Sequence, residues 1–330
     1  MRRRNKTLKK FTLAGAVAIL APFFISGQQT KPAAPLDGED AIFSSETRLV
    51  PLNVTVTDKS GRLVTNLPQS AFQVYENGVL QQIKLFKRED VPVSLGLIID
   101  NSGSMREKRQ GVESAALALV KDSNPQDEVF IVNFNDEVYM DTEFTSDIKK
   151  MEQGLTKIDS RGGTAMREAI KLSVEHLKGT DGGPGAKRDK KVVLVVTDGN
   201  DNASTVSLEA LTRLAQQDDV LIYAIGLLTD EDKREAKKAQ RALQLLAEST
   251  GGTVFYPKDV SEVDRIAHQV ARDIRNQYTI AYTPSNAALD GTYRQIKLVV
   301  KAPGNPIART RSGYYATNDQ KAGAPRKPPS

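Results

Sequence analysis

The sequence contains no cysteine and no tryptophan, and only two of its 330 residues are histidine. Without cysteine the chain can form no disulfide framework, no thiolate nucleophile and no cysteine-containing zinc site. Any metal site must therefore use oxygen ligands or the two histidines, His176 and His268. Both lie in segments with a helical pattern, and we expect them to be ordinary helix residues rather than a catalytic base or a ligand.

The sequence also lacks three short motifs that mark common enzyme classes. It has no Gly-x-x-x-x-Gly-Lys-[Ser/Thr] phosphate loop, no Gly-x-Ser-x-Gly nucleophile elbow and no His-Glu-x-x-His zinc helix. These absences favour a protein that is not an enzyme.

Acidic residues are missing from the first 27 positions, which carry six Lys and Arg side chains. The basic stretch precedes an apolar run at residues 11–25 and small residues at 26–27, a pattern typical of an export signal. We expect residues 1–27 to be a cleaved signal peptide or an uncleaved N-terminal anchor. The protein is then exported: periplasmic, secreted or associated with the cell surface, with membrane contact only through this segment.

The excess of positive charge belongs to that same N-terminal segment. Removing its six basic residues from the 46 Lys and Arg of the chain leaves 40, against 41 Asp and Glu, so the formal net charge falls from +5 to near −1. A chain with this balance has no general attraction for polyanions. We therefore expect no nucleic-acid partner.

Two segments with alternating apolar and polar residues flank the middle of the chain. Residues 47–90 include Asn77-Gly78 between two such runs, which is a strong hairpin signal because Asn-Gly accepts positive φ angles. Residues 277–316 return to the same alternation. Neither segment has enough strands to bury a face alone, so we predict that they pair into one β-sandwich. Residues 28–46 have the composition of a linker, and residues 317–330 that of a disordered tail.

Residues 91–276 follow a different pattern, in which short apolar β-branched runs alternate with amphipathic helical segments. Continuous apolar strands between helices are typical of a mostly parallel sheet that is covered on both faces. The fold class predicted is α/β, a doubly wound domain inserted into the β-sandwich. The run at residues 137–144 follows its predecessor too closely for a crossover helix, so we expect an antiparallel edge strand there.

Oxygen-bearing side chains follow the strands of this predicted sheet. Asp100, Ser102 and Ser104 come at the end of the first apolar run, Asp198 ends "KKVVLVVTD", and Thr164 follows a Gly-Gly pair. In a doubly wound sheet the loops at the carboxyl ends of the strands form the binding crevice. Such a set of oxygen ligands suits Mg²⁺ or Mn²⁺. On spacing alone, an Asp or Ser after a strand can equally cap the next helix.

The stretch "DNSGSM", followed in order by "GGT" and "VVTDGNDN", resembles the metal-ion-dependent adhesion site of von Willebrand factor A domains. The resemblance extends over residues 91–275, and the flanking β segments are similar to bacterial secreted proteins related to that domain. It implies that Ser102, Ser104 and Thr164 coordinate the ion directly or through water. It also implies that Asp100 and Asp198 hold ligating waters or bind the ion directly.

In that family the ion keeps an open position, which a carboxylate from another protein fills. The resemblance therefore implies a metal-dependent module for protein binding, with a partner that the sequence does not name. The alternative is a hydrolase or phosphoryl-transfer enzyme that uses the same metal to activate water.

Overall fold

The computed structural model describes residues 48–88, 90–121, 124–155, 161–199, 201–228 and 233–317. The predicted signal or anchor at 1–27 and the linker at 28–46 lie outside these residues, as does almost all of the predicted tail at 317–330. Those expectations, and the domain boundaries at residues 90 and 276, stay predictions.

The middle of the chain forms a sheet that has six strands among the described residues, in the order β10-β9-β8-β5-β6-β7. Its strands are β5 (Val93–Asp100), β6 (Glu128–Phe134), β7 (Val138–Thr145), β8 (Lys190–Thr197), β9 (Val220–Gly226) and β10 (Val254–Phe255). Every residue of β5, β6 and β9 is buried, as their continuous apolar sequences require for a sheet covered on both faces. All pairs are parallel except β6 with β7, which confirms the antiparallel edge strand.

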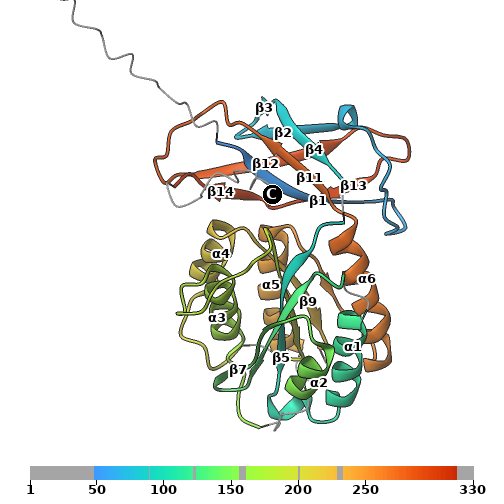
Figure 1. The fold of residues 1–330 in the computed structure, drawn as a ribbon, viewed down its shortest axis with the longest axis vertical. Coiled ribbons are helices and arrows are strands. Elements are labelled where there is room, and N and C mark those ends of the chain that lie inside the picture. The colour runs from blue at the N-terminus through green and yellow to red at the C-terminus, as the bar shows by residue number, and fades with distance from the viewer. Residues whose placement is uncertain are drawn as a thin grey trace, which may run out of the picture. The chain divides into compact units, whose positions relative to one another are not determined.

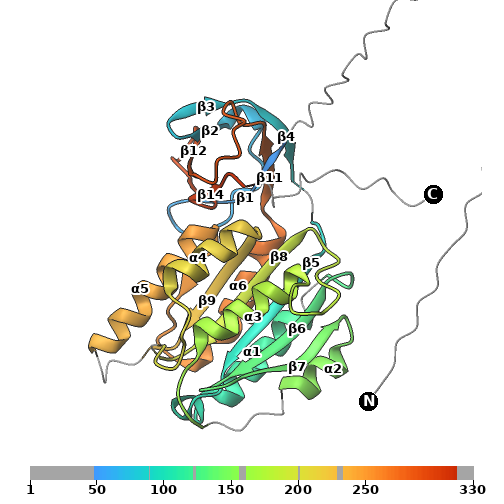
Figure 2. The ribbon, with the colours of Figure 1, turned by 90° about the vertical axis from the view of Figure 1, so that its left-hand side faces the viewer.

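Helices cover both faces of this sheet (Figures 1 and 2). The apolar side chains of α1, α2 and α6 join one buried cluster with one face, and those of α3, α4 and α5 join a second cluster with the other. Their bounds are α1 (Arg109–Lys121), α2 (Ile148–Leu155), α3 (Met166–Lys178), α4 (Leu208–Gln217), α5 (Lys233–Thr250) and α6 (Val263–Arg275). This arrangement confirms the doubly wound α/β class. Helix α2 had not been predicted.

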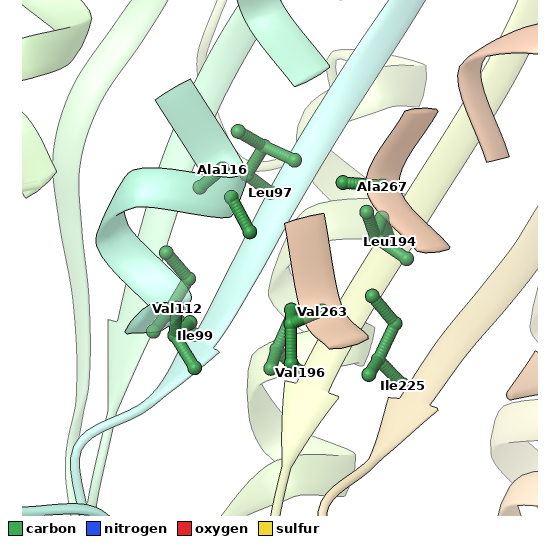
Figure 3. A pocket seen from close by; sticks show the side chains of 10 residues that line it. Leu97, Ile99, Val112, Ala116, Leu194, Val196, Ile225, Val263 and Ala267 are labelled. Carbon is green, nitrogen blue, oxygen red and sulfur yellow. The ribbon is translucent and has the colours of Figure 1, made fainter. Parts of the chain in front are cut away.

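Figure 3 shows a small cavity in the first cluster, between the sheet and helices α1 and α6. Its volume is about 10 Å³. It is lined by apolar side chains alone, among them Leu97, Val112 and Val263. A cavity of this size holds at most one water, and an apolar one stays dry. It is a packing defect of the core and offers no ligand site.

The flanking segments form two further four-stranded antiparallel sheets, β13-β1-β11-β4 and β14-β12-β2-β3. From the first segment come β1 (Val50–Thr57), β2 (Phe72–Glu76), β3 (Val79–Gln81) and β4 (Ile83–Lys87). From the second come β11 (Tyr278–Tyr282), β12 (Tyr293–Val300), β13 (Ile307–Arg309) and β14 (Gly313–Tyr315). Strand β1 pairs with β11 and β13, and β2 pairs with β12. The predicted pairing of the two segments is confirmed.

Within the first segment the structure differs from the simple antiparallel piece that alternation suggests. Of the strands described in this segment, only β2 and β3 pair with each other, around the turn in which Asn77 and Gly78 have φ angles of 47° and 81°. Strands β1 and β4 belong to the other sheet, where both contact β11. Which of these strands pairs with a strand so far along the chain cannot be deduced from local alternation.

The two sheets share a buried core and a buried polar network. Glu76 accepts hydrogen bonds from the hydroxyls of Tyr282 (2.7 Å) and Tyr314 (2.9 Å). Tyr314, which is buried, is therefore a packing residue of the sandwich. Burial raises the pKa of both tyrosines above the usual range, and so does the bond to Glu76.

A buried lysine at the start of β8 gives a prediction about pH. Burial lowers the pKa of Lys190 from 10.5 to about 7, although Asp90 and Asp127 favour its charged form. Its ammonium donates to the carbonyl of Ile274. Because the unfolded chain holds this proton more tightly, the free energy of unfolding should rise as the pH increases from about 7 toward 10.5.

We expect Lys190→Met to remove this dependence. Between pH 7 and pH 9 the free energy of unfolding of the wild type should rise by about 2 kcal/mol more than that of the variant. Urea unfolding at both pH values measures this difference. Lys191→Met, at the next position of β8, is the matched control and should keep the wild-type dependence. Parallel curves for the wild type and Lys190→Met would show that Lys190 titrates normally.

Candidate metal site

The five predicted ligands are placed by three neighbouring parts of the α/β domain. Asp100 is the last residue of β5, and Ser102 and Ser104 lie in the turn that follows it. Asp198 directly follows β8, and Thr164 precedes α3. Because β5 and β8 are adjacent and parallel, their carboxyl ends meet at one edge of the sheet. We call these five residues the oxygen cluster.

The carboxylate of Asp100 is fixed inside this edge. Its Oδ1 accepts from the backbone N–H of Ser102 at 2.8 Å, and its Oδ2 accepts from the hydroxyl of Thr197 at 2.5 Å. The residue is 1% exposed. Burial raises the pKa of Asp100 to about 6, the bonds from Thr197 and Ser102 oppose the rise, and the charge of Asp198 adds to it. A divalent cation here would favour the ionised form instead.

Hydroxyl groups connect the end of β5 to the end of β8. The hydroxyls of Ser102 and Ser104 lie 3.2 Å apart, and Ser104 Oγ donates to Asp198 Oδ1 at 2.8 Å. The turn between them, Gly103–Met105, is a short 3₁₀ helix in which Met105 is buried. The buried methionine anchors the turn, in which the Ser104 hydroxyl reaches Asp198 and the Ser102 hydroxyl lies beside that of Ser104.

Thr164 is held beside the same strand ends. Its backbone N–H donates to Asn202 Oδ1 at 2.9 Å, and its carbonyl accepts from the N–H of Asn202 at 3.1 Å. A Cβ atom built on Gly199, the residue after Asp198, would lie 3.8 Å from Thr164 Oγ1. The structure thus brings the threonine hydroxyl to the loop that carries Asp198, and places all five predicted residues at one edge.

The donor set fits a hard divalent cation. Two carboxylates and three neutral hydroxyls offer oxygen only, which is the ligand type of Mg²⁺ and Mn²⁺. Among the described residues there is no group of three or more His, Asp and Glu side chains that could hold an ion. An ion at this edge would therefore depend on the hydroxyls as much as on the two carboxylates.

Three residues that support the cluster had not been predicted. Thr197 bonds Asp100, Asn202 holds the backbone of Thr164, and Lys108 lies 2.6 Å from Asp198. A signal for Thr197 was present, since it is a polar residue at the end of the apolar run of β8. Nothing in the sequence connects Lys108 to a residue 90 positions further along.

The two histidines lie outside the cluster. His176 is ten residues after the first residue of α3, or about 15 Å along the helix. It is buried against Phe130 and Phe144, and its Nδ1 contacts Asp181 at 2.6 Å. His268 is on α6 with Asp264 at 3.6 Å. His176 is thus more constrained than an ordinary helix residue, but it is a core residue and does not face the oxygen cluster.

Strand order, helices on both faces and an oxygen cluster at the carboxyl edge of the sheet define a doubly wound α/β domain. The family model of the von Willebrand factor type A domain matches residues 95–269, more than half of the chain, and the chain belongs to this family. A search of curated proteins found no match.

Solved structures resemble this chain at low sequence identity. Proximal thread matrix protein 1 from the mussel byssus, described with a zinc-occupied MIDAS motif, is 16% identical, with 60% of this chain and 49% of that chain covered and a TM-score of 0.48. The vWF domain of a type V pili tip protein from Porphyromonas gingivalis is 14% identical, with coverages of 56% and 97% and a TM-score of 0.44. This chain spans about half the length of the mussel protein.

Proposed function

We propose that the protein is an exported, non-enzymatic binding module that holds Mg²⁺ or Mn²⁺ in the oxygen cluster and captures an acidic side chain of a protein partner. The observation that carries this proposal is the contact chain from Ser102 through Ser104 to Asp198 beside the buried Asp100. It joins hydroxyls and carboxylates from two strand ends into one set of oxygen ligands.

The chemistry of the set favours binding over catalysis. The bound ion would supply a Lewis-acidic position for an oxygen ligand, with Ser102, Ser104 and Thr164 as neutral ligands that leave much of its charge for the incoming group. Both carboxylates are already engaged by hydrogen bonds, and His176 is buried against Phe130 and Phe144. The hydrolase alternative gains no specific support from these contacts.

Export is the second part of the proposal and rests on the basic and then apolar N-terminal sequence. In the part of the chain that the structure describes, the helices are too short or too polar to span a membrane. The N-terminal segment is the candidate for an anchor if it is not cleaved.

Titration calorimetry with Mn²⁺ tests the metal site. We expect the wild type to bind Mn²⁺, Asp100→Ala to bind it roughly a hundredfold more weakly, and Thr164→Ala to bind it more weakly than the wild type, because each variant loses one oxygen ligand. Asp290→Ala removes a carboxylate from a sandwich loop and is the matched control. Equal affinity in the wild type and Asp100→Ala would contradict the assignment of the site.

Capture of the partner tests the function itself. The wild type, immobilised with Mg²⁺, should retain a protein from an extracytoplasmic extract, and chelator or Asp100→Ala should abolish this retention. Capture that is insensitive to both would place binding on another surface. Turnover of a phosphoester or peptide that disappears in Asp100→Ala would instead support the enzyme alternative.

A further inference from the structure

A lysine ammonium contacts the oxygen cluster directly. Lys108 Nζ lies 2.6 Å from Asp198 Oδ2, and it also donates to the carbonyl of Leu227 at 3.4 Å. The Asp198 side chain is 1% exposed and that of Lys108 is 19% exposed. An ion pair in such a place is weakly screened by solvent, unlike one at the surface.

The local fold holds Lys108 in this position. Its backbone N–H donates to the carbonyl of Met105 at 3.0 Å, and its carbonyl accepts from Val112 at 3.2 Å. Met105 and Val112 are both 1% exposed. The lysine is therefore fixed between the serine turn and α1, so its charge stays near the cluster.

The two carboxylate oxygens of Asp198 have different partners, the Lys108 ammonium and the Ser104 hydroxyl. Oδ2 faces Lys108 Nζ, and Oδ1 accepts from Ser104. With Asp100 and Asp198 ionised, the cluster and Lys108 together carry a formal charge of −1 rather than −2. A divalent ion that enters meets less attraction from the carboxylates and direct repulsion from the ammonium.

We propose that Lys108 is a built-in counter-cation that lowers the metal affinity of the oxygen cluster and stabilises Asp198 when no metal is bound. This inference rests on the proposed function, because it concerns the same site. Lys108 lies outside the oxygen cluster, and in this proposal it sets the affinity of the cluster for the ion.

Lys108→Met removes the charge and keeps most of the apolar stem. We expect it to bind Mn²⁺ roughly tenfold or more tightly than the wild type in titration calorimetry, since the repulsion is gone. Lys108→Gln removes the charge but keeps a hydrogen-bond donor, and it should shift the affinity in the same direction if the Met variant folds poorly. Lys121→Met, which removes a charge from the other end of α1, should leave the affinity unchanged.

A second readout does not depend on the affinity. In chelator, Lys108→Met should melt at a lower temperature than the wild type, because Asp198 loses its cation while it stays buried. Saturating Mn²⁺ should then raise its melting temperature by more than it raises that of the wild type. Equal Mn²⁺ affinities in the wild type and both Lys108 variants would overturn this inference alone. An absence of Mn²⁺ binding in all of them would overturn the proposed function with it.

Discussion

Gly252→Ala is expected to destabilise the protein by about 3–5 kcal/mol. A Cβ atom at this position would lie 1.9 Å from the carbonyl oxygen of Ile222, in the neighbouring strand β9. The clash is with backbone, which cannot move away by a change of rotamer. It falls where α5 ends and the chain turns back to the sheet, so β10 would have to separate from β9 or the strand would have to bend.

Urea unfolding followed by circular dichroism measures this loss. Gly103→Ala is the matched control, because a Cβ atom there meets nothing within 4 Å and its φ angle is not positive. We expect that control to stay within about 0.5 kcal/mol of the wild type. A Gly252→Ala protein as stable as the control would show that the packing of the α5 end against β9 is looser than described.

The segment of residues 28–90 is expected to be unfolded when it is produced alone. Of its four described strands, β1 pairs with β11 and β13, β2 has β12 on one side, and β4 pairs with β11. All of those partners lie after residue 277. The segment alone keeps the β2–β3 hairpin, and an isolated hairpin is at best marginally stable in water.

Amide hydrogen exchange compares the isolated segment with the full chain. We expect the amides of β1 to be protected in the full chain and unprotected in the isolated segment. Residues 91–276 contain all six strands of the α/β sheet and should unfold cooperatively by themselves. Protected amides in isolated 28–90 would contradict the split sandwich as a folding unit.

The sequence predicted the α/β class because its signals are local and repeated. Each parallel strand is a continuous apolar run, and Asn77-Gly78 marks its hairpin by backbone chemistry alone. Helix α2 was missed because it has eight residues, of which only Met151, Gly154 and Leu155 are buried. So short a pattern does not separate a helix from a polar loop.

Asp100 and Asp198 were expected to meet because the carboxyl ends of adjacent parallel strands lie at one edge of a sheet. The full set of five residues, including Thr164, was predicted from the resemblance to the adhesion-site motif. The contacts that support these five residues could not be predicted. Asn202 reaches Thr164 across 38 positions, and Lys108 reaches Asp198 across 90. Such contacts depend on how loops and helix starts pack, and no periodicity in the chain encodes them.

The α/β domain is inserted between two strands of the sandwich, and this connectivity determines which strands would bear a mechanical load. Strands β4 and β11 pair with Lys87 opposite Thr279, so the chain leaves the sandwich and returns to it at neighbouring strand ends. Tension between the two ends of the chain would pass through the sandwich and bypass the α/β domain. A pull applied at Asp100 would instead run along the full length of β5, which β6 and β8 hold on both sides by hydrogen bonds that must shear together.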